Sequence, residues 1–436
     1  MQLTPTAVAR RHRTWFRLAA WAFTALAVIP TGLRPSKVLG AAKQATAKNH
    51  DDEDDDEEED AEALARPRRS GVAVRASTAV SAYSDSDSVH VVSPTISGTV
   101  ADDIAGWSVN GRYLVDAVSA ASVDVVSAAS GHWFEIRHVG SLAADVKTGP
   151  VGLMVGGGLS REPDYLSLGL GGTISMELMD KNFTPFIGGS YGHDDVGRTG
   201  MDKAFWQSMQ KVGLQLGATF VVNRSTIASI SGDLILERGY LAKPYRYVPL
   251  FAPGVGASVP PGASVDLVNQ LRIDQRPADA LPDARDRFAV SGRIAHRFDS
   301  STVRFDQRLY RDSWGLTAST SDARYTVDAG GRWSLGPHVR FHAQHGIDFW
   351  QRAYEATLVA GGTLAIPRYR TGDRELGPLK TVTAGAGARY LLNTDIHSPW
   401  ALTVQLEGIY TQFEDALYLK SRRALFANLS LDVGFE

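Results

Sequence analysis

Hydrophobic and polar residues alternate along most of this chain. In residues 164–178 nearly every even position is apolar, whereas the odd positions are polar or glycine, and the same period of two recurs at 211–222, 287–298 and 401–413. A period of two predicts β-strands with one apolar face. These stretches run ten to fourteen residues, longer than the average strand of about five or six. That is the length a tilted strand needs to cross a bilayer.

Sixteen stretches qualify as strands, and the alternation is weakest in the first, second and twelfth. The candidates are 74–83, 89–100, 107–116, 132–147, 151–160, 164–178, 182–192, 209–222, 226–238, 287–298, 301–311, 316–328, 338–350, 380–391, 401–413 and 425–435. Bacterial membrane barrels have even strand numbers. We therefore predict an all-β fold, a transmembrane antiparallel β-barrel of about 14 to 16 strands.

The C-terminal residues and the aromatic residues near the ends of the strands fit this prediction. Leu429, Leu431, Val433 and Phe435 alternate with polar residues up to the last position but one. This resembles the C-terminal strand signal of bacterial outer-membrane barrels, although Glu436 follows the aromatic residue. It predicts binding to the barrel assembly machinery. Aromatic residues near the ends of the stretches fit interfacial girdles; they are Trp107, Trp133, Tyr165, Trp206, Trp314, Trp333, Trp350 and Trp400.

One connection stands apart from the strands. Residues 239–286 hold seven of the nineteen prolines, so they do not form a strand pair, and they are long for a simple connection. Two interpretations remain open. The segment folds inward as a constriction or lid over one mouth, or it is a surface loop packed on its own side chains.

The polar faces of the predicted strands carry many charges, which predicts a charged lumen. The candidate lumen-lining residues are Arg112, Asp116, Asp124, Arg287, Arg293, Arg304, Asp306, Arg308, His338, Arg340, His342 and Gln344. Asp116 and Asp124 occupy the same position in the two copies of the repeat VDAVSAAS–VDVVSAAS at 115–130. Such a pair can bind a cation or act as acid and base, but a salt bridge to lumen arginines is the commoner outcome.

The first seventy residues differ in composition from the rest. Arginines followed by a short apolar stretch and small residues predict a signal peptide at 1–42. Eleven acidic residues lie within 51–62; like charges repel, so 43–72 is predicted to be a disordered acidic periplasmic segment with a possible periplasmic partner. The barrel is predicted to span 73–436. Because eight of the 45 basic and eleven of the 48 acidic residues precede position 63, the remainder is electrically balanced, which argues against nucleic acid as a partner.

The sequence offers little catalytic chemistry. Cys is absent, which removes thiol catalysis and cysteine-based metal sites. His193 beside Asp194 and Asp195 raises the possibility of an outer-membrane hydrolase, but no nucleophile signature accompanies it. His338 and His342 share a face whereas His345 does not, so a metal site would need ligands from another strand. We predict no catalytic, cofactor-binding or metal-binding residues, and we expect that the protein is not an enzyme.

Several stretches resemble a known family. They are YSDSDSVHVVSPTISG at 83–98, the repeat at 115–130, ERGYLAKPYRYVPLFAPGV at 237–255 and LYRDSWGLTASTSDARY at 309–325. Together they are similar to an uncharacterised family of Gram-negative bacteria catalogued as domain of unknown function 3570, over residues from about 75 to the end. The resemblance implies a predicted outer-membrane barrel, often encoded near flavin-transferase and thioredoxin-like genes, and no catalytic residues.

Two functions follow from this reading. The first is an outer-membrane channel or transporter for polar or charged solutes, since lumen charges set selectivity. The alternative is a plugged barrel that scaffolds an extracytoplasmic complex, with the acidic segment as its grip; the gene neighbours that the resemblance implies link such a complex to redox chemistry.

Overall fold

The computed structural model describes residues 71–120, 133–358, 364–393, 395 and 398–435. The predicted signal peptide, nearly all of the acidic segment and Asp124 lie outside the described residues.

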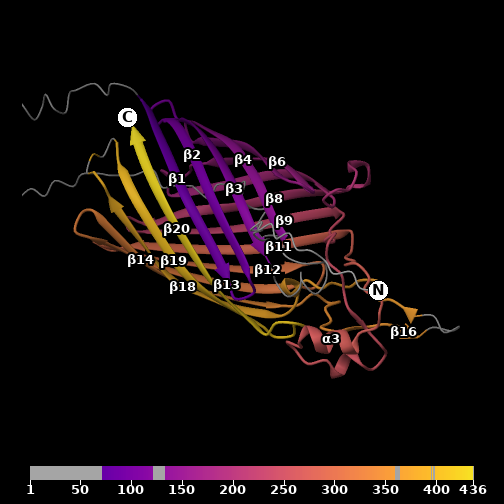
Figure 1. Ribbon diagram of the computed structural model, residues 1–436. Coiled ribbons are helices and arrows are strands. Elements are labelled where there is room, and N and C mark those ends of the chain that lie inside the picture. The colour runs from indigo at the N-terminus through magenta and orange to yellow at the C-terminus, as the bar shows by residue number, and fades with distance from the viewer. Residues whose placement is uncertain (1–70, 121–132, 359–363, 394, 396–397, 436) are drawn as a thin grey trace, which may run out of the picture.

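Sixteen antiparallel strands form one closed barrel (Figure 1). In ring order they are β1 (Val72–Asp85), β2 (Val89–Asp102), β3 (Trp107–Ala120), β4 (Trp133–Thr148), β5 (Val151–Glu162), β6 (Tyr165–Met176), β7 (Phe183–Val196), β8 (Gln207–Asn223), β9 (Thr226–Gly239), β11 (Ala284–Arg297), β12 (Ser301–Asp312), β13 (Thr317–Ala329), β14 (Trp333–His345), β18 (Leu379–Leu391), β19 (Trp400–Phe413) and β20 (Ser421–Phe435). The first and last strands close the ring, with Val74 opposite Phe435 and Asp85 opposite Ala424. The predicted fold class is confirmed, and every candidate stretch overlaps one barrel strand.

The predicted strand at 338–350 is displaced. The structure places β14 at Trp333–His345. The alternation misplaces the strand because it continues beyond His345 into residues that pack in a cluster of the connecting loops. Ile347 is buried with Trp314 and Leu316, and Phe349 packs against that cluster. Period two therefore identifies the strand but not its end.

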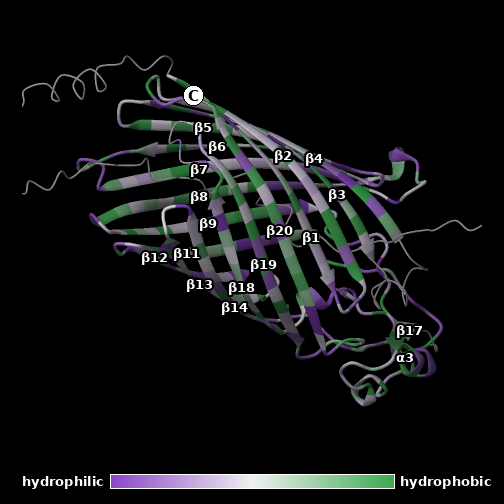
Figure 2. Cartoon of the chain, turned by 60° about the vertical axis from the view of Figure 1, so that its left-hand side comes forward, coloured by the Kyte–Doolittle hydropathy of each residue, from purple (hydrophilic) through white to green (hydrophobic). Residues whose placement is uncertain are grey.

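The outer wall carries the apolar residues of each strand. Leu170, Ile187, Leu309 and Val339 are among the exposed large hydrophobic side chains, and such residues occur along the outward faces of most strands (Figure 2). An apolar outer face with polar inward positions is the arrangement of a barrel in lipid. No helix among the described residues is long and apolar enough to span a bilayer.

The aromatic girdles are less complete than predicted. Trp333 and Trp400 are exposed and contact Tyr390 and Phe435 near the C-terminal end of the barrel. Trp314 and Trp350, in contrast, pack in a cluster formed by the connections that follow β12 and β14, and Tyr165 is also buried. The expectation that these last three residues belong to a girdle is wrong: packing among the loops holds the two tryptophans, whereas Tyr165 faces inward, where its hydroxyl donates to Asp194.

The weak alternation of the twelfth candidate has a structural explanation. On the outward face of β12 and β13, the Gln307 amide donates to Ser319 Oγ at 3.0 Å, and Ser321 Oγ donates to Gln307 Oε1 at 2.6 Å. The mutual hydrogen bonds satisfy polar groups that would otherwise face an apolar surface. β13 is a full barrel strand whose outward face is small and polar over its first half, from Thr317 to Ser321.

The two ends of the barrel differ. Turns at the end that holds the C-terminus are mostly short, whereas the long connections gather at the opposite end, where α3 (Val265–Leu271) also lies (Figure 1). Bacterial barrels have short periplasmic turns and longer extracellular loops. We call the end of this barrel that carries the long connections the loop end.

Three connections at the loop end form a structure that we name the cap: residues 240–283, 346–378 and 414–420. It contains α3, the short strands β10 (Leu250–Phe251), β15 (Tyr354–Glu355), β16 (Thr357–Leu358) and β17 (Leu364–Ala365), and the 3-10 turns η2 (Gly256–Ser258) and η3 (Arg374–Leu376); η1 (Lys203–Phe205) lies in the β7–β8 loop. β10 pairs with β15 in parallel. Phe251, Val259 and Val268 are fully buried in a cluster joined by Ala353 and Leu417. Residues of all three connections therefore share one apolar core.

The lipid-facing assignment of β20 predicts opposite effects for adjacent positions. Leu429→Arg places a charge on the outer wall near the middle of the strand and is expected to lower the free energy of unfolding by about 2–4 kcal/mol. Ser430→Arg, whose side chain points inward, is the matched control and is expected to cost far less. Urea unfolding of the refolded protein in lipid vesicles measures both; equal losses would contradict the assigned faces.

Candidate functional site

The inward face of β11–β19 carries a band of paired charges. Neighbouring strands bring Arg293, Asp306, Asp322 and Arg340 into one row of register. Asp306 pairs with Arg293 and, at 2.6 Å, with Arg304.

The adjacent row contains a bridged histidine. Asp322 accepts from Arg324 Nε at 3.2 Å and lies 2.8 Å from His338 Nε2, while His338 Nδ1 lies 2.8 Å from Glu407. Acidic and basic groups thus alternate across several strands of one wall.

These charges border a space that the described chain does not fill. The side chains of Arg293, Arg304 and Arg324 are 42%, 36% and 45% exposed although they point into the barrel. Arg112 on β3 and Arg340 on β14 are also exposed inward-facing residues, and neither has an ion pair within the described ranges. A guanidinium group without a carboxylate partner is available to a solute.

The other predicted lumen residues are held by neighbours. Arg287 pairs with Glu237, and Arg308 pairs with Asp233, both at 2.8 Å. His342 Nδ1 lies 2.8 Å from Thr320 Oγ1.

Two more of the predicted residues lie toward the loop end. The amide of Gln344 donates to the backbone oxygens of Glu375 and Gly377 and so joins β14 to the cap. Asp116 lies 2.6 Å from both Arg137 and the hydroxyl of Ser93. The structure therefore gives Asp116 a salt bridge.

The opposite wall is different in character. The inward positions of β1–β6 are mostly small and uncharged; they include Ser77, Ser81, Ser97, Ser141, Gly156, Gly158, Ser167, Gly169 and Gly171. The charged side chains of the lumen are therefore concentrated on the β11–β19 wall, whereas the β1–β6 wall is more sparsely charged and exposes Arg112.

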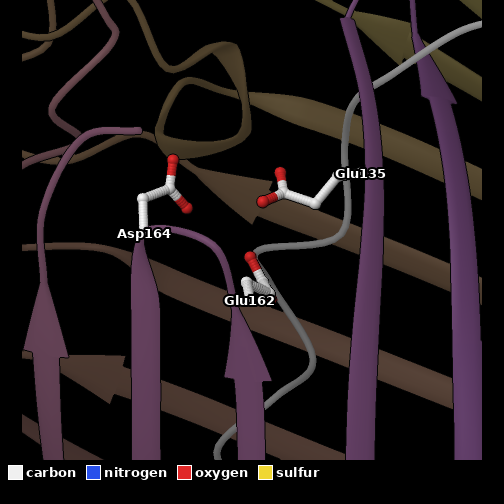
Figure 3. Close-up of side chains that lie close together, drawn as sticks. All are labelled: Glu135, Glu162 and Asp164. Carbon is white, nitrogen blue, oxygen red and sulfur yellow. The ribbon is translucent and has the colours of Figure 1, made fainter. Parts of the chain in front are cut away.

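Three carboxylates gather where the inward face of β4 and β5 reaches the loop end. Glu135 from β4, Glu162 from β5 and Asp164 from the following turn point toward one another (Figure 3), with ligand oxygens within 4.8 Å. Such oxygens suit Ca²⁺ or Mg²⁺. Arg137 Nε lies 4.0 Å from Glu162, and Thr199 and Tyr245 donate to Asp164. Cap and barrel groups thus compete with any ion for this cluster.

The cap is fastened to the rim at several points around the ring. Tyr245 donates to Asp164 in the β5–β6 turn, and burial together with this hydrogen bond raises the pKa of Tyr245 to about 12. Arg198 of the β7–β8 loop donates to the backbone oxygen of Pro244. Arg374 forms an ion pair with Asp87 in the β1–β2 turn.

These contacts carry the cap across the mouth. Leu250 pairs with Tyr354 and Ala280 bridges to Arg370, so the first two cap segments are joined. The second segment connects β14 to β18, which lie opposite β5 and β6 in the ring. Because Tyr245 of the first segment reaches the β5–β6 turn, the joined segments span the mouth from one side to the other. Of the two interpretations of residues 239–286, the structure shows a lid that also has a core of its own.

A buried ionic network holds the cap segments together. Asp373 lies 2.5 Å from both Lys243 and Arg246. Burial opposes the charge of Asp373, but Arg246 and Lys243 outweigh it, so the pKa of this carboxyl lies well below its usual range. Burial lowers the pKa of Lys243, and burial raises that of the nearby Asp279. A desolvated ionic group is stable only while its partners remain.

Sequence reasoning missed the cap network and the carboxylate cluster. Lys243 and Asp373 are 130 residues apart, and no spacing signal connects them. Glu162 and Asp164 flank the β5–β6 turn, yet Glu135 comes from a different hairpin. Strand pairing in the barrel and packing among the cap segments bring these residues together.

The three residues considered for hydrolysis are divided between the two faces of the wall. Asp194 is buried on the inward face, where Tyr165, Ser167 and Lys211 donate to it. His193 has the opposite parity and lies 3.2 Å from Asp195. Neighbours in sequence therefore lie on opposite faces of the wall.

Asp373→Asn is expected to loosen the cap, because it leaves Lys243 and Arg246 without their shared anion. Removing one partner of a buried ion pair costs about 3–5 kcal/mol, so cleavage within residues 240–283 in limited proteolysis should accelerate at least tenfold. Asp274→Asn, an exposed cap residue, is the control. Since the folded pKa of Asp373 lies below its ordinary value of 3.8, its contribution is present above that pH and is lost only in stronger acid. The assignment would be contradicted if cleavage of the unmodified protein rose between pH 7 and pH 5 and Asp373→Asn removed that rise.

Several solved structures are similar to the chain at low sequence identity. The chain is similar to a bacterial polysaccharide outer membrane secretin (10% identity, 84% of this chain and 98% of that chain covered, TM-score 0.42). It is also similar to OprD from Pseudomonas aeruginosa (8%, 84% and 96%, TM-score 0.40) and to the siderophore receptor PirA from Pseudomonas aeruginosa (9%, 85% and 81%, TM-score 0.34). No functional inference rests on likenesses of this strength.

Comparison at the level of sequence is more selective. No curated protein sequence matches the chain. The profile of the family described as "Protein of unknown function (DUF3570)" matches residues 134–416, a shorter range than the resemblance from about residue 75 to the end. The chain belongs to this family.

Proposed function

We propose that the protein is an outer-membrane channel or transporter for polar or charged solutes. The observation that carries the proposal is the exposed, charged inward wall: Arg293, Arg304 and Arg324 are more than a third exposed inside a closed ring of sixteen strands. Rings of this size leave an aqueous interior unless something fills it. Lumen charges then select solutes by field and hydrogen bonding.

The outer membrane is the proposed location. The apolar outer wall and the complete pairing of strand edges suit lipid, and bacterial barrels of this kind reside there. The lipid bilayer is then the surrounding partner, and the alternating C-terminal strand β20 is the proposed signal to the barrel assembly machinery. Orientation follows from the loop lengths, with the cap outside the cell.

The cap decides whether solutes enter from that side. It is held to the rim by side-chain contacts of Tyr245, Arg198 and Arg374. A few side-chain contacts hold less strongly than the continuous backbone hydrogen bonds between two paired strands. A displaced cap would expose the charged wall to the outside. We therefore propose that the capped form is the low-conductance state.

The cap also favours a second candidate function. A mouth spanned by packed loops suits a closed barrel that scaffolds an extracytoplasmic complex, as does an acidic segment of eleven acids in residues 51–62 that offers a grip for a basic periplasmic partner. No enzymatic activity is proposed, since His193 and Asp194 lie on opposite faces of the wall.

Reversal of one lumen charge tests the channel. In planar bilayers the refolded protein is expected to show discrete conductance steps, larger in Asp373→Asn than in the unmodified chain. Arg340→Glu should shift the reversal potential toward cation preference, whereas Arg311→Glu, an exposed outward residue, should leave it unchanged. Electrical silence of both the unmodified chain and Asp373→Asn would reject the channel.

Deletion of residues 43–62 separates the two candidates. A channel should conduct as before, because the sixteen barrel strands lie within residues 72–435, whereas a scaffold should lose its periplasmic partner in cross-linking from intact cells. Replacement of the acidic run by neutral Ser and Gly residues of equal length is the control for linker length. Partner capture that survives both changes would reject the grip.

A further inference from the structure

An apolar groove crosses the outer wall of β1–β6. Its volume is about 890 Å³, within the range of about 300–1,000 Å³ typical of ligand sites. Large residues of the outer wall line it, among them Ile96, Tyr113, Leu142 and Leu159. The strands concerned are neighbours in the ring (Figure 1).

Three glycines hollow out this groove, and the backbone does not require them there. A Cβ atom at Gly140 would meet nothing within 4 Å, one at Gly98 only the Arg75 oxygen at 3.9 Å, and one at Gly111 only Leu142 Cδ1 at 3.8 Å. None of the three has a positive φ. Glycine weakens a strand, so the missing side chains are explained by the space that they leave free.

A polar group lies beside the groove toward the loop end. His138 is the outward register neighbour of Arg161, and its Nδ1 lies 2.7 Å from the Tyr113 hydroxyl, on the rim of the groove. Both His138 and Arg161 are exposed. Across the described ranges, Arg161 has no carboxylate partner.

The position of this group matches a membrane interface. Along the outer face of β5 the residues Leu153, Val155 and Leu159 are exposed and apolar, and Arg161 is the next outward residue toward the loop end. A cation at the edge of an apolar belt attracts an anionic headgroup. Arginine is well suited to phosphate, because its planar donors bind it in a bidentate manner.

We propose that this groove binds a phosphate-bearing, acylated lipid of the outer leaflet. An acyl chain lies along Gly98, Gly111 and Gly140, and the phosphate accepts hydrogen bonds from Arg161 with His138 beside it. The apolar trough and the adjacent cation complement the two parts of one amphiphile. A second protein chain would not need a lone arginine at that edge, and the channel function does not depend on this site.

Lipid retention in native mass spectrometry tests the site. The full chain, folded in detergent micelles, is titrated with lipid A and with dephosphorylated lipid A. One tightly held lipid A per chain is expected, with affinity at least roughly tenfold weaker for the dephosphorylated form and for Arg161→Ala, as for loss of a charge-assisted hydrogen bond. Gly140→Leu fills the groove and should abolish retention.

Matched controls distinguish this site from general contact with lipid. Arg311→Ala removes an exposed outward arginine of β12, and Gly292→Leu fills an outward position of β11 where a Cβ would meet only an oxygen at 4.0 Å; both should bind as the unmodified chain does. Heat-modifiable mobility on gels confirms that each variant is folded. Equal retention by all variants, indifference to phosphate, or a dimer that Gly140→Leu dissociates would overturn the proposal.

Discussion

The structure depends on one constraint: within lipid, every backbone N–H and C=O must find a partner in the protein. The pairing of β1 with β20, from Val74–Phe435 to Asp85–Ala424, removes the only edges that a sheet of this kind would otherwise present. Strand length, strict alternation and antiparallel order all follow from it, because each strand must cross the bilayer with one face toward lipid. The loops are released from the constraint, and there the chain departs from regularity.

Closure creates the interior, and the cap modifies it. Sixteen strands enclose a lumen wide enough for water, so in the proposed channel selectivity and access would depend on what projects into it. The charged wall of β11–β19 acts within the ring, whereas the cap acts at one mouth. The cap resembles a small globular domain more than a loop: it has a buried apolar cluster around Phe251 and Val268 and an internal ionic network around Asp373. The barrel tolerates it because rim residues such as Asp87 and Asp164 anchor it.

Departures from ideal alternation are informative in this protein. The outward Gln307, Ser319 and Ser321 satisfy one another by hydrogen bonds, so a polar patch persists on a face that is otherwise apolar. Gly98, Gly111 and Gly140 leave a hollow that no backbone contact requires. Ile347 continues the apolar period of β14 but turns into the cap core. Each departure therefore marks a place where something besides the period of two sets the residue: a neighbouring strand at Gln307, an open space at the three glycines and the cap core at Ile347.

The sequence by itself determined the fold class, a strand number of about 14 to 16 and the alternation of faces along the strands, because a bilayer imposes period two and a minimum length on each strand independently of all the others. Each of the sixteen stretches, including the weakly alternating 316–328, corresponds to a barrel strand. Only the tertiary structure decided where β14 ends, that Trp314 leaves the lipid interface, and that Lys243 meets Asp373 across 130 residues. It also brought together Glu135, Glu162 and Asp164. Such meetings depend on ring order and on packing between loops, which no local period encodes.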